Sequence, residues 1–299
     1  MNTILDCIGN TSLVALRESR ILLKAESENP TGSMKDRMAL AMIEGAEANG
    51  RLAPGGTVVE YTGGSTGVSL SFVCAVKRHP LHVVTSDAFA AEKLQHMKIL
   101  GANLHVLHSE TGGMTEKLTR DMIAMAHDIA SKTGAYMTDQ MKNTDSLAAY
   151  HKMADEIWSQ TNGQVDVFIQ SVGTAGSIRG NAERLRQLNP KIRIIAVEPA
   201  ESPVLSGGKS GSHKIDGIGA GYVVPLWHDR IADQIERVST EEAMDMALRL
   251  AREDGVFAGT STGANVVAAH RIAGQMPGAT IVTVMVDSGM KYLKTYAQK

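Results

Sequence analysis

Lys35 stands where a glycine-containing turn leads into a predicted helix, in the segment NPTGSMKDR (residues 29–37). The apolar run MALAMI follows it almost directly. A cation is disfavoured at the positive end of a helix dipole, so this place suits a neutral amine better than a charged ammonium. Neutral lysine amines form Schiff bases with carbonyl compounds. The segment therefore indicates amine chemistry at Lys35, against the simpler interpretation of a solvated surface ammonium.

Three glycine-rich segments are candidates for binding an anion through backbone amides, namely TGGSTG (62–67), GTAGS (173–177) and AGTSTGA (258–264). Glycine permits tight turns, and the free N–H groups at a helix start bind anions. A plain strand-to-helix turn is the alternative for each segment taken alone. None has the GxGxxG spacing or the GK[ST] ending, which counts against a nicotinamide dinucleotide or a nucleoside triphosphate.

Predicted strands and predicted helices, which must position these residues, alternate along the chain. Helical patterns with apolar residues three and four apart separate β-branched, largely apolar runs that we predict to be buried strands. The predicted strands are 57–61, 81–86, 102–108, 165–172, 192–198 and 280–286. This alternation predicts an α/β protein with mainly parallel sheets, in which ligands bind beyond the carboxyl ends of the strands.

Composition restricts the class of protein further. The 299 residues suffice for two domains, and 43% hydrophobic with 21% charged residues is the balance of a globular chain. A net charge of -2 gives no electrostatic reason to expect nucleic acid or an anionic membrane surface as a partner. Without a membrane-spanning run or a signal-peptide pattern, we expect a cytoplasmic protein. The two cysteines and ten histidines lack metal-ligand spacing, so no metal site is expected.

Pyridoxal phosphate needs an amine for its aldehyde, an anion site for its phosphate and a partner for its ring nitrogen. The chain resembles the cysteine synthase and cystathionine β-synthase family, the fold type II pyridoxal phosphate enzymes, over nearly its whole length. Seven segments carry the resemblance in the family's order: IGNTSLVAL (8–16), NPTGSMKDR (29–37), TGGSTG (62–67), GTAGS (173–177), KIDGIGAGYVVP (214–225), AGTSTGA (258–264) and VDSGMKYL (286–293).

The resemblance implies which residues bind pyridoxal 5'-phosphate. Lys35 matches the lysine that bonds covalently to the cofactor and later takes the substrate's Cα proton. Ser261 matches the serine that hydrogen-bonds the pyridine nitrogen, a partner that leaves the ring a weaker electron sink than a carboxylate does. The phosphate loop matches Gly173, Thr174, Ala175, Gly176 and Ser177.

TGGSTG matches the loop that holds the substrate carboxylate. The usual sequence of this loop in the family is TSGNTG. Gly63 replaces a serine, and Ser65 replaces the asparagine that contacts the cofactor's ring hydroxyl. The other implied substrate-binding residues are Thr62, Gly64, Thr66, Gln140 and Gly217. Asp216 lies where family members close over the substrate, and it is either a solvated loop acid or a general acid or water activator.

The implied reaction is β-replacement on an activated serine through an aminoacrylate, most simply O-acetylserine plus sulfide giving L-cysteine and acetate. Because the loop is altered, two alternative activities remain. The enzyme is either a β-elimination lyase, or a synthase that uses another amino acid (serine, cysteine or phosphoserine) or another nucleophile. A dinucleotide-dependent oxidoreductase and a non-catalytic scaffold are more remote alternatives.

The resemblance also implies an architecture similar to that of the tryptophan synthase β subunit, with two three-layer domains and the cofactor in the cleft between them. Residues 36–145 would form the smaller, mobile, substrate-binding domain. Residues 1–35 and 146–299 would form the larger domain that binds the cofactor's phosphate. A homodimer acting on a small amino acid is the family's usual state.

Overall fold

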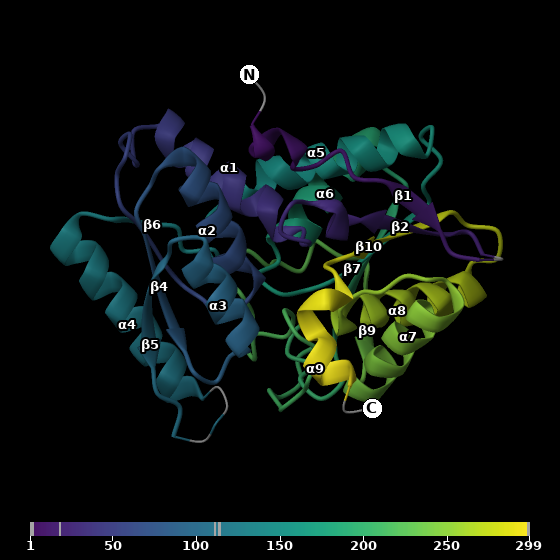
Figure 1. Cartoon of the computed structure of the whole chain (residues 1–299). Helices are drawn as coiled ribbons and strands as arrows, with labels where there is room; N and C mark the ends of the chain where they lie inside the picture. Colours follow the sequence, from purple (N-terminus) through teal and green to yellow (C-terminus); the bar gives the residue numbers. More distant parts are fainter. Residues whose placement is uncertain (1–2, 18, 111, 113–114, 298–299) are drawn as a thin grey trace. The chain divides into compact units, whose positions relative to one another are not determined.

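A computed structural model describes residues 3–17, 19–110, 112 and 115–297 (Figure 1). The chain divides into two compact units, each built around one sheet. The first contains the described residues of Met1–Ile8 and Lys35–Ser146, and the second those of Gly9–Met34 and Leu147–Lys299. Within the described ranges, no helix combines the length and the apolar character that crossing a membrane requires.

The sheet of the first unit has four parallel strands in the order β5-β4-β3-β6. The strands are β3 (Val58–Tyr61), β4 (Leu81–Ser86), β5 (Asn103–Leu107) and β6 (Tyr136–Met137). The helices are η1 (Ile4–Cys7), α1 (Lys35–Ala48), α2 (Ser65–Lys77), α3 (Ala91–Ile99) and α4 (Glu116–Thr133). Helix α4 covers one face of this sheet and α2 the other, which makes three layers (Figure 1).

The sheet of the second unit has six strands in the order β1-β2-β10-β7-β8-β9, and only the β1–β2 pair is antiparallel. The strands are β1 (Leu13–Ala15), β2 (Ile21–Ala25), β7 (Val167–Ser171), β8 (Arg193–Pro199), β9 (Gln234–Val238) and β10 (Ile281–Met285). The helices are η2 (Glu26–Glu28), α5 (Asp145–Gln160), α6 (Gly176–Leu188), α7 (Thr240–Glu253), α8 (Thr260–Gln275), η3 (Gly289–Tyr292) and α9 (Leu293–Tyr296). Helices α7 and α8 lie on one face, with α5 and α6 on the opposite face (Figure 1).

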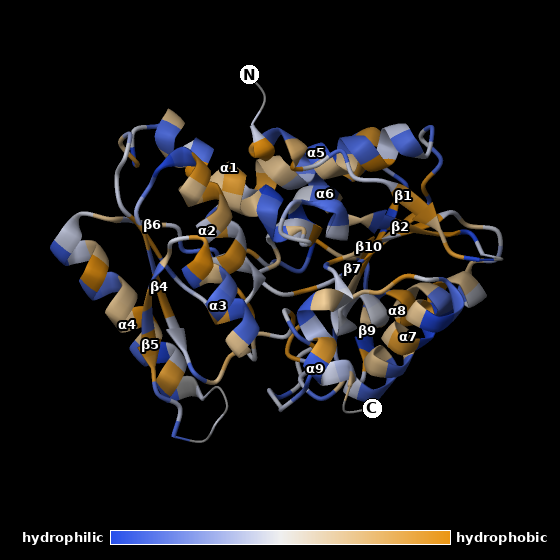
Figure 2. Ribbon diagram, viewed as in Figure 1, coloured by the Kyte–Doolittle hydropathy of each residue, from blue (hydrophilic) through white to orange (hydrophobic). Residues whose placement is uncertain are grey.

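Burial explains why these segments form strands. All five residues of β7 are buried, as are the last six of β8, and β-branched side chains fill nearly half of these places. Figure 2 shows the hydrophobic colour along the strands and alternating colours along α4, α5 and α7, as expected for helices with one face on a core. The six predicted segments all form strands, and the α/β class with mainly parallel, helix-covered sheets is confirmed. The predicted burial is wrong for β5, which lies at the edge of its sheet and has no buried residue.

Helices α7 and α8 approach each other closely at Gly263. A Cβ placed on Gly263 would overlap the carbonyl of Ala243 and lie 3.0 Å from the backbone nitrogen of Ala247. Both obstacles are backbone atoms of α7, which cannot swing aside as a side chain does. Gly274, in the same helix, has no atom within 4 Å of the equivalent position.

We predict that Gly263→Ala lowers the free energy of unfolding by about 1–3 kcal/mol, the usual cost of overpacking. Gly274→Ala is the matched control and should raise it by about 0.5–1 kcal/mol, because alanine is the better helix former. Urea denaturation of both variants measures the difference. Equal stabilities would contradict the close approach of the two helices.

Candidate active site

The carboxyl ends of β2, β10 and β7 meet at one edge of the larger sheet, because these neighbouring strands are parallel. The chain continues from them into the NPTGSMKDR segment, the VDSG segment (residues 286–289) and the GTAGS loop, respectively. In open α/β sheets this edge is where ligands bind. Three of the segments singled out from the sequence thus come together at one edge.

The VDSG segment fixes the backbone that leads into Lys35. The N–H of Met34 donates to the carbonyl of Val286 at 3.0 Å, and the N–H of Ser288 donates to the carbonyl of Gly32 at 3.0 Å. Ser33 and Asp287 form an isolated antiparallel bridge between these two bonds. The residue directly before the lysine is therefore held by backbone hydrogen bonds.

The same segment also holds the start of α8, which carries Ser261. Gly259 donates to the carbonyl of Asp287 at 3.2 Å, and Val286 donates to the hydroxyl of Thr262 at 3.0 Å. Ser261 lies between these two contacts, in the first turn of the helix, and is only 2% exposed. Met34 and Ser261 are thus positioned by one short stretch of chain.

The GTAGS loop forms a tight turn at the start of α6. Ala175 has left-handed backbone angles (φ 67°, ψ -11°) directly before the helix. Within the described part of the chain, the backbone N–H groups of residues 173–177 donate to no protein acceptor. Free N–H groups at a helix start suit a phosphate.

The loop is also crowded on one side by the 214–219 segment. A Cβ on Gly173 would overlap the carbonyl oxygen of Gly217, so only glycine fits there. Asp216 donates its N–H to the hydroxyl of Thr260 at 3.2 Å, and Gly219 donates to the carbonyl of Val172 at 3.0 Å. The predicted residue Gly217 therefore lies against the predicted phosphate loop.

Two buried amide side chains, which the sequence patterns did not reveal, join these loops. Gln170 Nε2 lies 2.7 Å from the hydroxyl oxygen of Ser177 and 3.5 Å from the sulfur of Met34. Asn265 accepts from the N–H of Ser171 at 2.7 Å and donates to the carbonyl of Val284 at 2.9 Å. The only signal available was a polar residue in an otherwise apolar run, VFIQS for the first and GANVVAA for the second.

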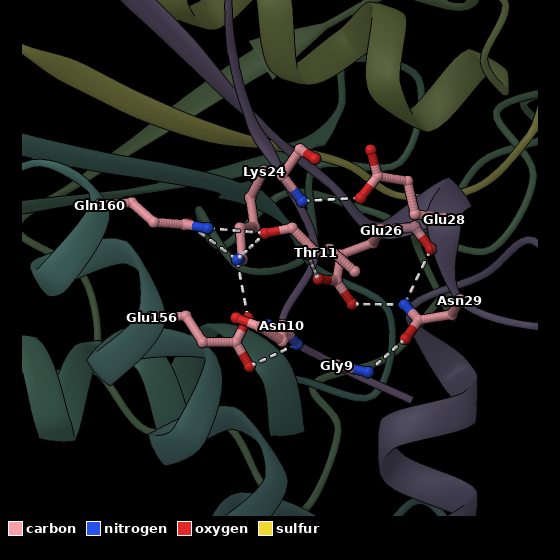
Figure 3. A network of polar contacts seen from close by, with 10 residues as sticks. Gly9, Asn10, Thr11, Lys24, Glu26, Glu28, Asn29, Glu156 and Gln160 are labelled. Atoms are coloured by element: carbon pink, nitrogen blue, oxygen red, sulfur yellow. Dashed lines mark hydrogen bonds and ion pairs between the residues drawn. The ribbon is translucent and has the colours of Figure 1, made fainter. Parts of the chain in front are cut away.

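A polar network anchors the start of the NPTGSMKDR segment (Figure 3). The carboxylate of Glu26, fully buried, accepts from Asn29 Nδ2 at 2.8 Å and from the hydroxyl of Thr11 at 2.7 Å. Lys24, also fully buried, donates to the Thr11 carbonyl at 2.6 Å and pairs with Glu156 at 2.7 Å. The segment before Lys35 is therefore fixed at both its ends.

The TGGSTG loop lies in the first unit, between β3 and α2. Thr62 donates its N–H to the carbonyl of Val84 at 2.9 Å, and Gly64 donates to the hydroxyl of Thr62 at 3.3 Å. The hydroxyl of Thr66 donates to Gln140 Oε1 at 2.8 Å. The structure thus brings together two of the predicted substrate-binding side chains, Thr66 and Gln140, while Ser65 is the first residue of α2.

Glu60 supports this loop from the core of the sheet. Its buried carboxylate accepts from the hydroxyl of Thr138 at 2.6 Å and from the N–H of Gln140 at 3.1 Å. Burial raises the pKa of Glu60 to about 7, although hydrogen bonds from Thr138, Gln140 and Tyr61 oppose the shift. A titrating carboxyl therefore positions Gln140, which in turn contacts Thr66.

The cysteines offer no nucleophile at these loops. Burial raises the pKa of the Cys74 thiol to about 12, and Cys7 is exposed on η1. Among the described residues, no group of three or more His, Cys, Asp or Glu side chains could hold a metal ion.

The fold is that of an α/β enzyme whose larger sheet carries, at one edge, a helix-start turn with N–H groups suited to a phosphate. Residues 4–287 match the family model described as pyridoxal-phosphate dependent enzyme. A cysteine synthase of Staphylococcus aureus is 37% identical over 304 residues, which cover 99% of this chain and 96% of that protein. The chain therefore belongs to the pyridoxal-phosphate dependent enzymes, and its cofactor is pyridoxal phosphate.

Two solved structures are similar to the whole chain. O-acetylserine sulfhydrylase isoform 3 from Entamoeba histolytica has a TM-score of 0.92 and 36% identity, covering 98% of this chain and 90% of that one. A hydrogen sulfide-producing enzyme from Fusobacterium nucleatum has a TM-score of 0.91 and 34% identity, covering 98% of both chains. The predicted resemblance to fold type II enzymes is confirmed.

We predict that Glu60 makes stability depend on pH. Its folded-state pKa lies above the ordinary 4.5, so its contribution is fully present below pH 4.5 and is lost as the pH rises through about 7. Glu60→Gln cannot titrate, so the free energy of unfolding of the wild type should fall relative to that of the variant over this range. Denaturant titrations at several pH values measure the difference, and parallel pH curves would contradict the raised pKa.

Proposed function

We propose that the enzyme replaces the acetoxy group of O-acetylserine with sulfide, giving L-cysteine and acetate. The Cβ–O bond breaks, a Cβ–S bond forms, and the Cα proton is removed and later returned. The observation that carries the proposal is the joint attachment of the Lys35 segment and the Ser261 turn to residues 286–289. The cysteine synthase and O-acetylserine sulfhydrylase relatives support the choice of substrate.

The residues present fit the cofactor. The unsatisfied N–H groups of residues 173–177 would hold its phosphate, Ser261 its ring nitrogen, Lys35 its aldehyde carbon and Ser65 its ring hydroxyl. Bound pyridoxal phosphate withdraws electrons from the substrate's Cα, which acidifies the Cα proton and lets a β-substituent leave.

The chain's own side chains supply the remaining steps. With the cofactor bound, the Lys35 amine would take the substrate's Cα proton and return it. Thr62, Gly63, Gly64, Thr66 and Gln140 bind the substrate carboxylate, and Gln140 orients the Thr66 hydroxyl. Gly217 would close over the substrate, with Asp216 beside it as a loop acid.

Residues 36–145 would move to exclude water while substrate is bound, and residues 1–35 and 146–299 would hold the phosphate. The placement of the cofactor between these two domains stays a prediction. We further propose, from the family resemblance, a homodimer that works in the cytoplasm on a small amino acid.

A β-elimination lyase that releases sulfide from cysteine is the second candidate. Gly63 and Ser65 depart from the family's carboxylate loop, and one structurally similar protein is a hydrogen sulfide-producing enzyme. Both reactions use the same lysine and differ in the leaving group and in the nucleophile that follows.

The covalent role of Lys35 is tested by reducing the holoenzyme with borohydride. We expect the visible absorbance to disappear and the peptide containing Lys35 to gain the mass of the reduced cofactor. Lys35→Ala should show neither change, whereas Lys98→Ala, an exposed lysine on α3, should behave as the wild type. A mass gain at another lysine in the wild type would refute the assignment.

The substrate is tested by mixing the holoenzyme separately with O-acetylserine, serine, phosphoserine and cysteine. We expect O-acetylserine to change the cofactor's absorbance and release acetate, and sulfide to restore the spectrum as cysteine forms. If cysteine instead changes the spectrum and releases sulfide while O-acetylserine does not, the lyase is the correct function.

A further inference from the structure

The departure from the family at Gly63 has a physical cause in the neighbouring loop. Strands β3 and β4 are parallel neighbours, with Tyr61 opposite Val84. The TGGSTG loop leaves β3 and the turn of residues 86–90 leaves β4, so both lie at the same edge of this sheet. Phe89 belongs to that turn.

Phe89 occupies the space that a side chain at position 63 would need. A Cβ placed on Gly63 would overlap three ring carbons of Phe89, Cγ, Cδ2 and Cε2. The backbone angle of Gly63 lies outside the left-handed range, so it does not itself demand glycine. Gly64, the next residue, has no atom within 4 Å of its own Cβ position. The ring of Phe89, rather than backbone strain, therefore excludes a side chain at position 63.

The turn that carries Phe89 is well anchored. Phe89 donates its N–H to the carbonyl of Ser86 at 3.2 Å, and Asp87 donates to the carbonyl of Leu107 at 3.2 Å. The carboxylate of Asp87 accepts from the N–H of Ser109 at 2.7 Å and contacts His108 at 2.6 Å. The Phe89 ring packs against the apolar cluster between α4 and the sheet. The ring is thus held in place over the loop.

We propose that Phe89 determines substrate specificity by covering Gly63 in the carboxylate loop. This inference rests on the proposed function, because it assumes that TGGSTG binds an amino acid. A serine at position 63 would offer a hydroxyl donor, whereas the ring offers an apolar surface with a weakly negative face. In this arrangement the loop's backbone N–H groups and hydroxyls hold the carboxylate, and the β-substituent lies against the ring. A phosphate or another strongly solvated β-substituent would lose hydrogen bonds there without replacement. The site therefore favours amino acids with a small, uncharged β-substituent.

Thermal unfolding of four variants tests the packing of the pair. We expect Gly63→Ser to lower Tm by several degrees and Phe89→Ala to lower it through a cavity. The double variant Gly63→Ser/Phe89→Ala should be more stable than the sum of the two losses predicts. Gly64→Ala is the control for adding a Cβ to the same loop and should not couple to Phe89→Ala. Additive losses in the double variant would overturn the proposal.

Ligand binding to the holoenzyme tests the specificity. Calorimetry gives the Kd of phosphoserine and of O-methylserine, a neutral ether with a poor leaving group, so no turnover is needed. The Kd of phosphoserine divided by that of O-methylserine should be roughly tenfold or more lower in Gly63→Ser/Phe89→Ala than in the wild type. A ratio within about twofold of the wild type, beside coupled Tm values, would show a purely structural ring and overturn the proposal. Turnover of O-acetylserine by the wild type tests the proposed function separately.

Discussion

The backbone pairing between residues 32–34 and the VDSG segment is the constraint on which the proposed active site depends. Lys35 follows Met34 directly, so the register of this pairing sets where the lysine's backbone begins. The opposite side of the same segment fixes the turn that carries Ser261. A shift of one residue in either pairing would reverse the directions of the side chains, because successive residues of extended chain point to opposite sides. One short segment therefore holds both Met34 and the turn that carries Ser261, which lie more than two hundred residues apart in sequence.

Buried polar side chains hold the loops of this arrangement through hydrogen bonds. Gln170, Asn265, Glu26 and Lys24 are all fully buried, and each has hydrogen-bond partners in neighbouring loops or helices. Removing one partner of such a group leaves a buried donor or acceptor unsatisfied, which costs about 1–3 kcal/mol. A network of this kind favours a single arrangement of the loops over alternatives of similar compactness.

The sequence predicted six strands from their β-branched, largely apolar residues, and all of these except the edge strand β5 are mainly buried. It did not reveal β1, β6 and β9, which are short or partly exposed, nor β2, whose run ILLKA contains a buried lysine. The motifs identified the loops because glycine turns leave a pattern in the chain. Gln170 and Asn265 left no such pattern, because the contacts that join the loops, from Gln170 to Met34 and from Asn265 to Ser171, are made only in the folded chain. Phe89 was missed for the same reason, because its effect on Gly63 acts only through space.

The contact between Phe89 and Gly63 also constrains how this loop can change during evolution. A serine cannot enter position 63 until position 89 has become smaller, so the two substitutions have a preferred order. Replacing Gly63 by serine while Phe89 is present would therefore cause a steric clash, although the backbone angles at position 63 would accept a serine. Homologues with a serine here should accordingly carry a smaller or differently placed residue at position 89, an association that an alignment of the family would reveal.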